Sequence, residues 1–113
     1  MPDQENQGFG FCAAHDLRKT HSIRGKSDSR RVQAILAQMT QIGWDGPPIA
    51  VTEYGGEKYI LDGHHRTFAA RKAEVLVHYR IVSLEELTEY GYNSIEEVVR
   101  AHAESGFNRI RLR

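Results

Sequence analysis

The sequence predicts an α+β domain in which helices pack against a small mixed β-sheet. Residues 49–54 and 57–61 are rich in strand-forming side chains, and Gly55-Gly56 between them is a two-residue turn signal, so they predict a β-hairpin. Apolar residues at helical spacing precede this hairpin, and residues 76–82 form a further strand-like run after it. The resulting order of loop, helix, hairpin, helix, strand and further helices is that of an α+β domain.

The chain before the hairpin divides into a polar segment, a basic loop and a helix. Residues 1–16 are predicted to be a linker or a flexible N-terminal segment, and residues 17–113 to form the domain. Residues 17–29 are predicted to form an ordered loop with a short strand near residues 20–23. A helix should follow and end at Gly43. Its apolar face consists of Val32, Ile35, Leu36, Met39 and Ile42, and its N-cap candidates are Ser27, Asp28 and Ser29.

The chain after the hairpin is predicted to be mostly helical. A short helix should run from residue 67 to residue 72 or 73, ahead of the third strand. Two Ser-x-x-Glu sequences, at residues 83–86 and 94–97, fit the capping box and predict two more helices, of which the second ends near Gly106. Residues 107–113 alternate apolar and polar side chains and should form an edge strand or a docked tail.

Composition is that of an ordinary globular domain. Hydrophobic residues make up 40% and charged residues 27%, and the formal net charge is zero, which disfavours tight DNA binding without sequence preference. Cys12 is the only cysteine, so the chain has neither an intramolecular disulfide nor a four-cysteine zinc site. No apolar run reaches membrane-spanning length and no signal-peptide pattern opens the chain, so no membrane partner is expected.

The strongest functional signal is the sequence Asp62-Gly63-His64-His65-Arg66, called the motif below. It lies between a strand and a helix, where unpaired backbone N–H groups and the positive end of the helix dipole bind anions. Gly63 permits the sharp turn, Arg66 can grip two phosphate oxygens, and the histidines supply proton transfer or metal ligation near neutral pH. The alternative is that Asp62 caps the helix and the histidines only pack or face water, but three adjacent donors favour function.

A second cluster, in residues 20–29, combines cations, hydroxyl groups and a glycine just ahead of a helix. His21, Arg24, Lys26 and Ser27 would cradle phosphate and form the opposite wall of one site. The cluster is not a Walker A loop, because the earlier glycine is missing, and the alternative is a solvated basic loop.

No spacing in the sequence demands a resident metal or a further catalytic group. The motif's acid, one of its histidines and His21 would converge only if the fold brought them together, and a structural zinc is not expected. Cys12 is interpreted as a small apolar residue, and Glu53 is a weaker candidate base. Packing roles are predicted for Trp44 and Tyr54, and no catalytic role is predicted for His15, His78 and His102.

The motif in this setting resembles the ParB/sulfiredoxin superfamily, and specifically its ParB-like nuclease-type members. The resemblance covers about residues 17–82. It includes the helix ending in Gly43-Trp44, the strand entry Pro48-Ile49-x-Val51, the Gly-Gly hairpin, and residues 60–70 with the sequence Ile-Leu-Asp-Gly-His-His-Arg-Thr-Phe-Ala-Ala.

The resemblance implies a ParB/sulfiredoxin-like fold and a nucleotide-type phosphate held by the turn from Gly63 to Thr67, facing Arg24. Members of the superfamily bind nucleoside triphosphates or act on phosphate-bearing substrates, as CTP switches, serine kinases, nucleases or ATPases. Mg²⁺ carried with a nucleoside triphosphate is the implied cofactor, and a nucleotide or nucleic acid is the implied partner. The compact helix pattern also resembles ParB-like domains at the ends of large secreted bacterial toxins, which implies a cytoplasmic site of action and a cognate immunity protein.

Three departures from the superfamily pattern restrict the function. Sulfiredoxins have a cysteine where this chain has His64, which argues against sulfinic-acid reduction. Partitioning proteins continue into a DNA-reading helix-turn-helix, whereas two acidic helices follow Val82 here. Relatives usually have a helix-ending glycine where this chain has Glu74.

The leading hypothesis is therefore an enzyme acting at phosphate: a nucleotide hydrolase or phosphotransferase, or a nuclease, in a toxin effector. His64, His65 and Asp62 are the catalytic candidates. The predicted phosphate-binding residues are Gly63, Arg66, Thr67, Arg24, Lys26, Ser27 and His21. The competing hypotheses are a CTP- or ATP-binding switch without turnover and a protein-interaction domain with a vestigial motif.

Overall fold

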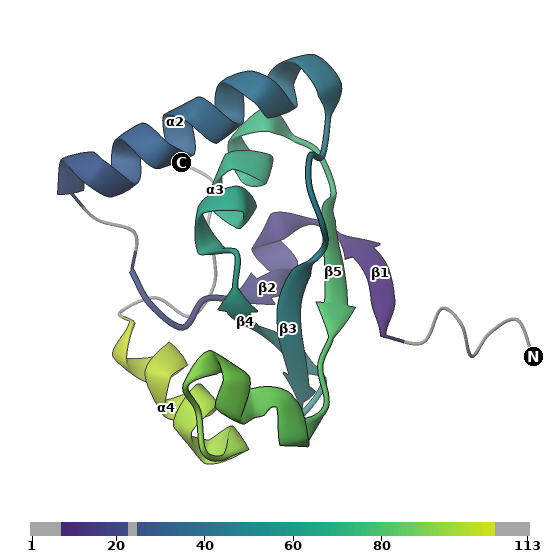
Figure 1. Ribbon diagram of the computed structural model, residues 1–113, viewed down its shortest axis with the longest axis vertical. Helices are drawn as coiled ribbons and strands as arrows, with labels where there is room; N and C mark the ends of the chain where they lie inside the picture. Colours follow the sequence, from purple (N-terminus) through teal and green to yellow (C-terminus); the bar gives the residue numbers. More distant parts are fainter. Residues whose placement is uncertain (1–7, 23–24, 106–113) are drawn as a thin grey trace, which may run out of the picture.

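The computed structural model describes residues 8–22 and 25–105, and its centre is one five-stranded mixed sheet (Figure 1). The strand order is β1-β5-β3-β4-β2. Strands β3 and β4 are antiparallel, as are β1 and β5, whereas β3 with β5 and β2 with β4 are parallel, so the predicted mixed sheet is confirmed. The strands are β1 (Phe9–Cys12), β2 (Leu17–Arg18), β3 (Ile49–Tyr54), β4 (Glu57–Asp62) and β5 (Val77–Ile81).

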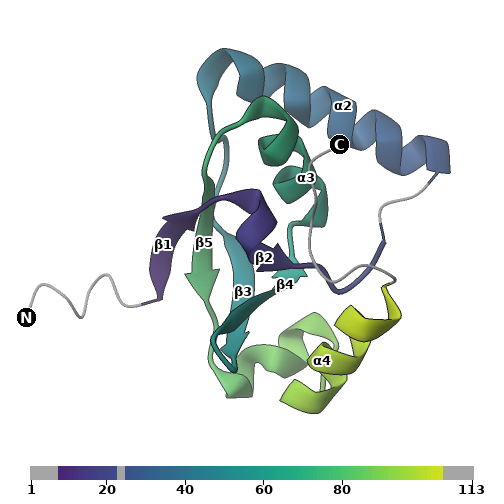
Figure 2. The same cartoon turned by 180° about the vertical axis from the view of Figure 1, so that it is seen from behind.

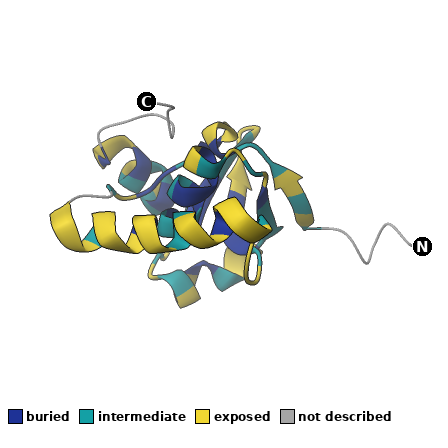
Figure 3. Ribbon diagram, turned by 90° about the horizontal axis from the view of Figure 1, so that it is seen from above, coloured by how far each residue is buried: buried dark blue, intermediate teal, exposed yellow. Residues whose placement is uncertain are grey.

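The helices cover the two faces of this sheet. Helices α2 and α3 enclose one core on their side, and η2 with α4 encloses a second core on the other; Figures 1 and 2 show α2 and α4 at opposite ends of the view. In Figure 3 the outward side of α2 is largely exposed. The helices are η1 (Ala14–Asp16), α2 (Gly25–Ile42), α3 (His64–Ala73), η2 (Leu84–Tyr90) and α4 (Ile95–Glu104).

Alternation along the strands divides the apolar residues between the two cores. Ile49 and Val51 of β3 face α2 and α3, whereas Ala50 belongs to the core under α4. In β4, Ile60 joins the first core and Leu61 the second. The central hairpin is buried on both sides because successive side chains of a strand point to opposite faces.

The predicted hairpin is confirmed, and its turn has a clear backbone cause. Gly55 and Gly56 have φ angles of 61° and 81°, in the region that glycine adopts at little cost. Two consecutive positive φ angles favour the tight turns whose twist matches that of paired strands. The motif therefore follows a strand whose direction is set by this turn.

The sheet begins earlier than the predicted domain start at residue 17. Residues 9–12 lie in the segment predicted as a linker, but they form β1, with Phe9 opposite Arg80 of β5. Strand β5 has an edge that β3 does not use, and backbone pairing with that edge orders a segment without a long apolar pattern. Residues 1–7 of the predicted linker lie outside the described residues.

The short strand predicted near residues 20–23 is displaced toward the N-terminus. Strand β2 is Leu17–Arg18, and it pairs with β4. The side chain of Leu17 is fully buried in the first core, so burial places the strand at this residue. Within the predicted loop, residues 23 and 24 lie outside the described residues.

The ends of α2 agree with the prediction only at the C-terminus. Gly43 has a φ of 81°, and its N–H donates to the carbonyl of Met39 at 2.8 Å, which ends the helix as predicted. At the other end α2 begins at Gly25, so the three predicted N-cap residues lie inside its first turns. Asp28 instead interacts favourably with the helix dipole from within that first turn.

Both predicted capping boxes begin helical segments, in different ways. Glu86 accepts the backbone N–H of Ser83 at 2.9 Å, but the segment that follows is a 3₁₀ helix rather than an α-helix. Ser94 accepts the N–H of Glu97 at 3.3 Å and caps α4, which ends at Glu104, slightly before the predicted end. The tail predicted at residues 107–113 lies outside the described residues.

Replacing Glu74 by glycine is expected to stabilise the protein by about 1 kcal/mol. Glu74 caps the C-terminus of α3 in a left-handed conformation, with a φ of 61° and a ψ of 39°, and Val75 N–H donates to Ala70 at 3.1 Å. Glycine adopts this conformation at lower cost than glutamate does. Urea unfolding of Glu74→Gly and Glu74→Ala separates backbone strain from charge, since alanine removes the carboxylate but keeps the strain. Equal stability of the two variants would contradict the strain argument.

Candidate functional site

The motif forms a strand–turn–helix junction, as predicted. Asp62 is the exposed last residue of β4, and α3 begins at His64. The N-cap of α3 is Gly63, with a φ of 110° and a ψ of 24°, so Asp62 is not the capping residue. A Cβ atom on Gly63 would lie 2.7 Å from the Cβ of Ile49. Only glycine therefore fits between the first turn of α3 and the buried strand β3.

His64 is a buried residue that holds the loop containing Thr20, which lies before α2 in the chain. Its side chain is 2% exposed, and Nε2 accepts the backbone N–H of Thr20 at 3.0 Å. Because Nε2 accepts, the ring is neutral and Nδ1 carries the proton. Burial, followed by the nearby His21, lowers the pKa of His64 to about 3. Proton exchange through Nε2 would require the Thr20 contact to break.

His65, in contrast, faces the start of α2. Its Nε2 lies 2.8 Å from Oδ1 of Asp28, and both side chains keep exposed surface. A carboxylate only accepts, so Nε2 of His65 donates and Nδ1 of the neutral ring keeps its lone pair. The pair joins the first turns of α2 and α3, and it gives His65 the orientation of a histidine held by an acid.

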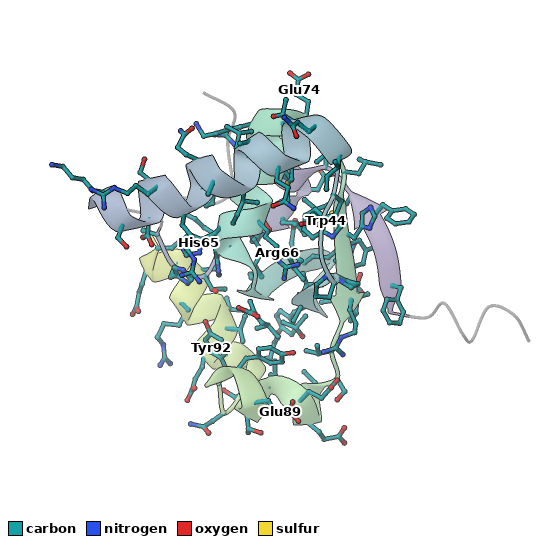
Figure 4. All side chains as sticks on the ribbon, turned by 45° about the horizontal axis from the view of Figure 1, so that its top comes forward. Trp44, His65, Arg66, Glu74, Glu89 and Tyr92 are labelled. Atoms are coloured by element: carbon teal, nitrogen blue, oxygen red, sulfur yellow. The ribbon has the colours of Figure 1, made fainter. Side chains whose placement is uncertain are left out.

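The Arg66 side chain extends from α3 toward the segment that enters β3. Its Nη1 donates to the carbonyl of Pro47, and its guanidinium carbon lies 5.4 Å from the centre of the Trp44 ring (Figure 4). Burial lowers the pKa of Arg66, and the carboxylates of Asp62 and Asp45 oppose this effect, so the charge persists at neutral pH. Arg66 is thus a partly ordered cation beside the turn.

Thr67 has no exposed surface, and it stabilises the turn. Its hydroxyl donates to the carbonyl of Gly63 at 2.9 Å, and its backbone N–H donates to the same oxygen at 2.9 Å. Both groups close the first turn of α3. We therefore assign Thr67 to the structure of the turn rather than to contact with a ligand.

The loop that carries His21 is held from two sides. Thr20 donates its hydroxyl to the carbonyl of Ile60 at 2.7 Å, next to the contact with His64. On the other side, Nδ1 of His102 in α4 donates to the carbonyl of Lys19 at 3.0 Å. His102 is therefore a buried histidine that holds this loop.

The remaining predicted phosphate ligands that the structure describes have exposed side chains. His21 is exposed, and its ring centre lies 3.8 Å from that of His64. The pKa of His21 is lowered first by the part of its ring that is buried, and second by His65. Lys26 and Ser27 are exposed in the first turn of α2, the turn that also carries Asp28. Arg24, the remaining predicted ligand, lies outside the described residues.

A groove of about 330 Å³ runs between α2 and α3, starting at the N-terminal end of α2. Two cationic side chains of α3, Arg71 and Lys72, contribute to its wall, opposite Ser29 and Gln33 of α2. The groove begins at Gly25, so it opens beside the exposed cations of the first turn. The lining residues are Gly25, Ser29, Val32, Gln33, Phe68, Arg71 and Lys72.

Sequence reasoning missed two residues that complete the site. Asp28 was interpreted only as a possible cap, yet it holds His65, and no spacing rule links residues 28 and 65. Trp44 packs against the first core, as predicted, but its ring also lies beneath Arg66. The one available signal was the Gly43-Trp44 pair at the end of a helix, which does not specify what the ring contacts.

Two observations bear on metals and membranes. Within residues 8–22 and 25–105, no three histidine, cysteine, aspartate or glutamate side chains gather as a metal-binding group. Among the helices that the structure describes, none is long and apolar enough to cross a membrane.

Comparison with known proteins supports the fold. No protein-family model and no curated protein matches the sequence. The structure is similar to the crystal structure of sulfiredoxin from Arabidopsis thaliana, with a TM-score of 0.54 and 25% identity, covering 73% of this chain and 94% of that chain. Together with the mixed sheet and its helices, this similarity shows that the chain has a sulfiredoxin-like α+β fold.

Proposed function

We propose that the chain is a phosphate-directed enzyme of the ParB-like type, which hydrolyses or transfers a nucleotide phosphoryl group or cleaves nucleic acid. The observation that carries this proposal is the 2.8 Å contact between His65 and Asp28, at the point where the first turns of α2 and α3 meet. An acid-held histidine beside helix N-termini and Arg66 combines a base with an anion site. The similarity to sulfiredoxin supports a fold in which enzymes occur.

In the proposed reaction, Nδ1 of His65 accepts the proton of an attacking water or hydroxyl group. The oxygen of that nucleophile bonds to phosphorus while the bond to the leaving oxygen breaks. Asp28 stabilises the imidazolium that forms, because its Oδ1 accepts a hydrogen bond from Nε2 at 2.8 Å. The proton on His65 then passes to the leaving group or to solvent, which restores the base.

The charge that develops on the phosphoryl oxygens would be stabilised by Arg66, by the N–H groups at the start of α3, and by His21, Lys26 and Ser27. Mg²⁺ would enter with a nucleoside triphosphate, and the exposed carboxylate of Asp62 would hold it. His64 would be a positioning residue, because its contact with Thr20 fixes the loop that carries His21. It replaces the cysteine of sulfiredoxins in this proposal.

Replacing His65 by glutamine is expected to reduce turnover by about 10²- to 10⁴-fold, the usual contribution of a general base. Phosphate release from each nucleoside triphosphate with Mg²⁺, and cleavage of labelled single-stranded DNA and RNA, measure the two reaction types. His15→Gln is the matched control, because His15 forms a similar pair with Asp16 at 3.5 Å on η1. Equal turnover by wild type and His65→Gln would refute this role.

The same assay separates the proposed enzyme from a nucleotide-binding switch. Tight nucleotide binding without product would favour the switch. The effector context has its own test, because expression of the chain in a bacterial cytoplasm should arrest growth and expression of His65→Gln should not. Co-expression with a cognate immunity protein should restore growth.

A further inference from the structure

The outer edge of the sheet carries a row of exposed aromatic side chains. Phe9 and Phe11 of β1 are 53% and 66% exposed. They stand opposite Arg80 and His78 of β5, and residues directly opposite each other share one face of a sheet. Figures 1 and 2 show β1 at the edge of the sheet, across the view from α4.

A continuous series of rings connects this edge to Arg66. The Phe11 and His78 ring centres are 4.5 Å apart, and the His78 ring stacks on Trp44 at 5.4 Å with an interplanar angle of 19°. The Arg66 guanidinium lies over the Trp44 ring, 5.4 Å from its centre. Phe11, His78 and Trp44, called the ring series below, therefore end at the cation of the candidate site.

A cleft of about 410 Å³ lies at the β1 end of the ring series. Phe9 and Phe11 are two residues apart on one strand, so their side chains leave the sheet about 7 Å apart. A planar ring in van der Waals contact on both of its faces needs about the same spacing. Pro48 and His78 complete the cleft, whose lining residues are Phe9, Gly10, Phe11, Pro48, His78 and Tyr79.

Cations stand at both ends of this aromatic face. Arg80 lies opposite Phe9, where it contacts Glu86 at 3.6 Å and the Tyr90 hydroxyl at 3.1 Å, and Arg66 lies beyond Trp44. Aromatic side chains between cations are the arrangement by which proteins bind single strands, because each base offers a π-face and each linkage a negative charge. A partner protein's aromatic residue would need only the cleft, not the two cations.

We propose that this face binds single-stranded nucleic acid, with one base between Phe9 and Phe11 and a phosphate further along the strand against Arg66. The rings of His78 and Trp44 lie between Phe11 and Arg66, so the base and the phosphate belong to different nucleotides of one strand. This inference rests on the proposed function and adds a nucleic acid strand to its substrates.

Binding of labelled 20-nucleotide DNA and RNA single strands, measured by fluorescence anisotropy, tests the proposal. Phe9→Leu and Phe11→Leu keep an apolar side chain but remove one ring, and each should weaken binding about 5- to 100-fold. Tyr54→Leu is the matched control, because Tyr54 is as exposed as Phe9, at 53%, but lies in the hairpin outside the ring series. Circular dichroism confirms that each variant is folded.

The outcomes separate this inference from the proposed function. Weaker strand binding by both phenylalanine variants, with unchanged phosphate release from nucleoside triphosphates, supports a strand site. Absent strand binding by wild type, or equal binding by all four proteins, overturns the inference and leaves the cleft to a protein's aromatic side chain. In that case a loss of phosphate release in His65→Gln would still support the enzyme, and full release would refute it separately.

Discussion

Replacing Gly63 by alanine is expected to destabilise the protein by about 3 kcal/mol or more, from two additive causes. Gly63 has a φ of 110°, a conformation that strains any side chain. A Cβ atom there would also lie 2.7 Å from the Cβ of Ile49 and still closer to its Cγ2. Ile49 is fully buried and cannot move aside without disturbing the first core.

Gly91→Ala separates the two causes. Gly91 has a φ of 91°, similar to that of Gly63, but nothing lies within 4 Å of a Cβ atom placed on it. Urea unfolding should therefore show a loss of about 1–2 kcal/mol for Gly91→Ala and a further loss for Gly63→Ala. Equal losses would mean that strand β3 accommodates the methyl group, contrary to the close contact with Ile49.

Lowering the pH from 7 to 5 is expected to remove about 2 kcal/mol of stability through His64 alone. The pKa of this histidine is about 3 in the folded protein, because of burial, against an ordinary value of 6.5. Between these two values the unfolded chain binds a proton that the folded chain does not. Stability therefore falls as the pH drops below 6.5 and reaches its full loss near pH 3.

His64→Gln removes this dependence, because an amide oxygen can accept the N–H of Thr20 but does not titrate in this range. The free energy of unfolding in urea is measured for both proteins at pH 7 and pH 5. The variant should lose about 2 kcal/mol less than wild type between the two pH values, whatever its stability at pH 7. His64→Asn is a second variant if glutamine does not fold. Parallel losses in wild type and variant would show that His64 takes up its proton in the folded state.

Local physical chemistry made the fold class and the central junction predictable. Consecutive glycines at residues 55 and 56 force a tight turn, and Gly63 allows the left-handed conformation between β4 and α3. These effects act within a few residues, so they can be recognised in the sequence. The end of α2 at Gly43 is predictable for the same reason.

Elements that depend on distant partners were less predictable. Strand β1 exists because β5 has an edge that β3 does not use. The capping box at residues 83–86 indicated a helix start but did not distinguish the 3₁₀ helix η2 from an α-helix. Strand β1 is short, and the alternation of its side chains covers too few residues to distinguish it from a polar linker. Whether such a segment forms a strand depends on backbone hydrogen bonds to a neighbouring strand edge, and these require little of its side chains.

The sequence by itself determined that a junction of glycine, two histidines and an arginine follows a strand. It did not determine the role of each side chain, because the two histidines are neighbours in a helix and point in different directions. The tertiary structure placed His64 under Thr20, where burial makes it neutral, and His65 against Asp28, where it keeps exposed surface. Which histidine is buried depends on what packs around α3, and that packing brings together residues more than 30 positions apart in the chain.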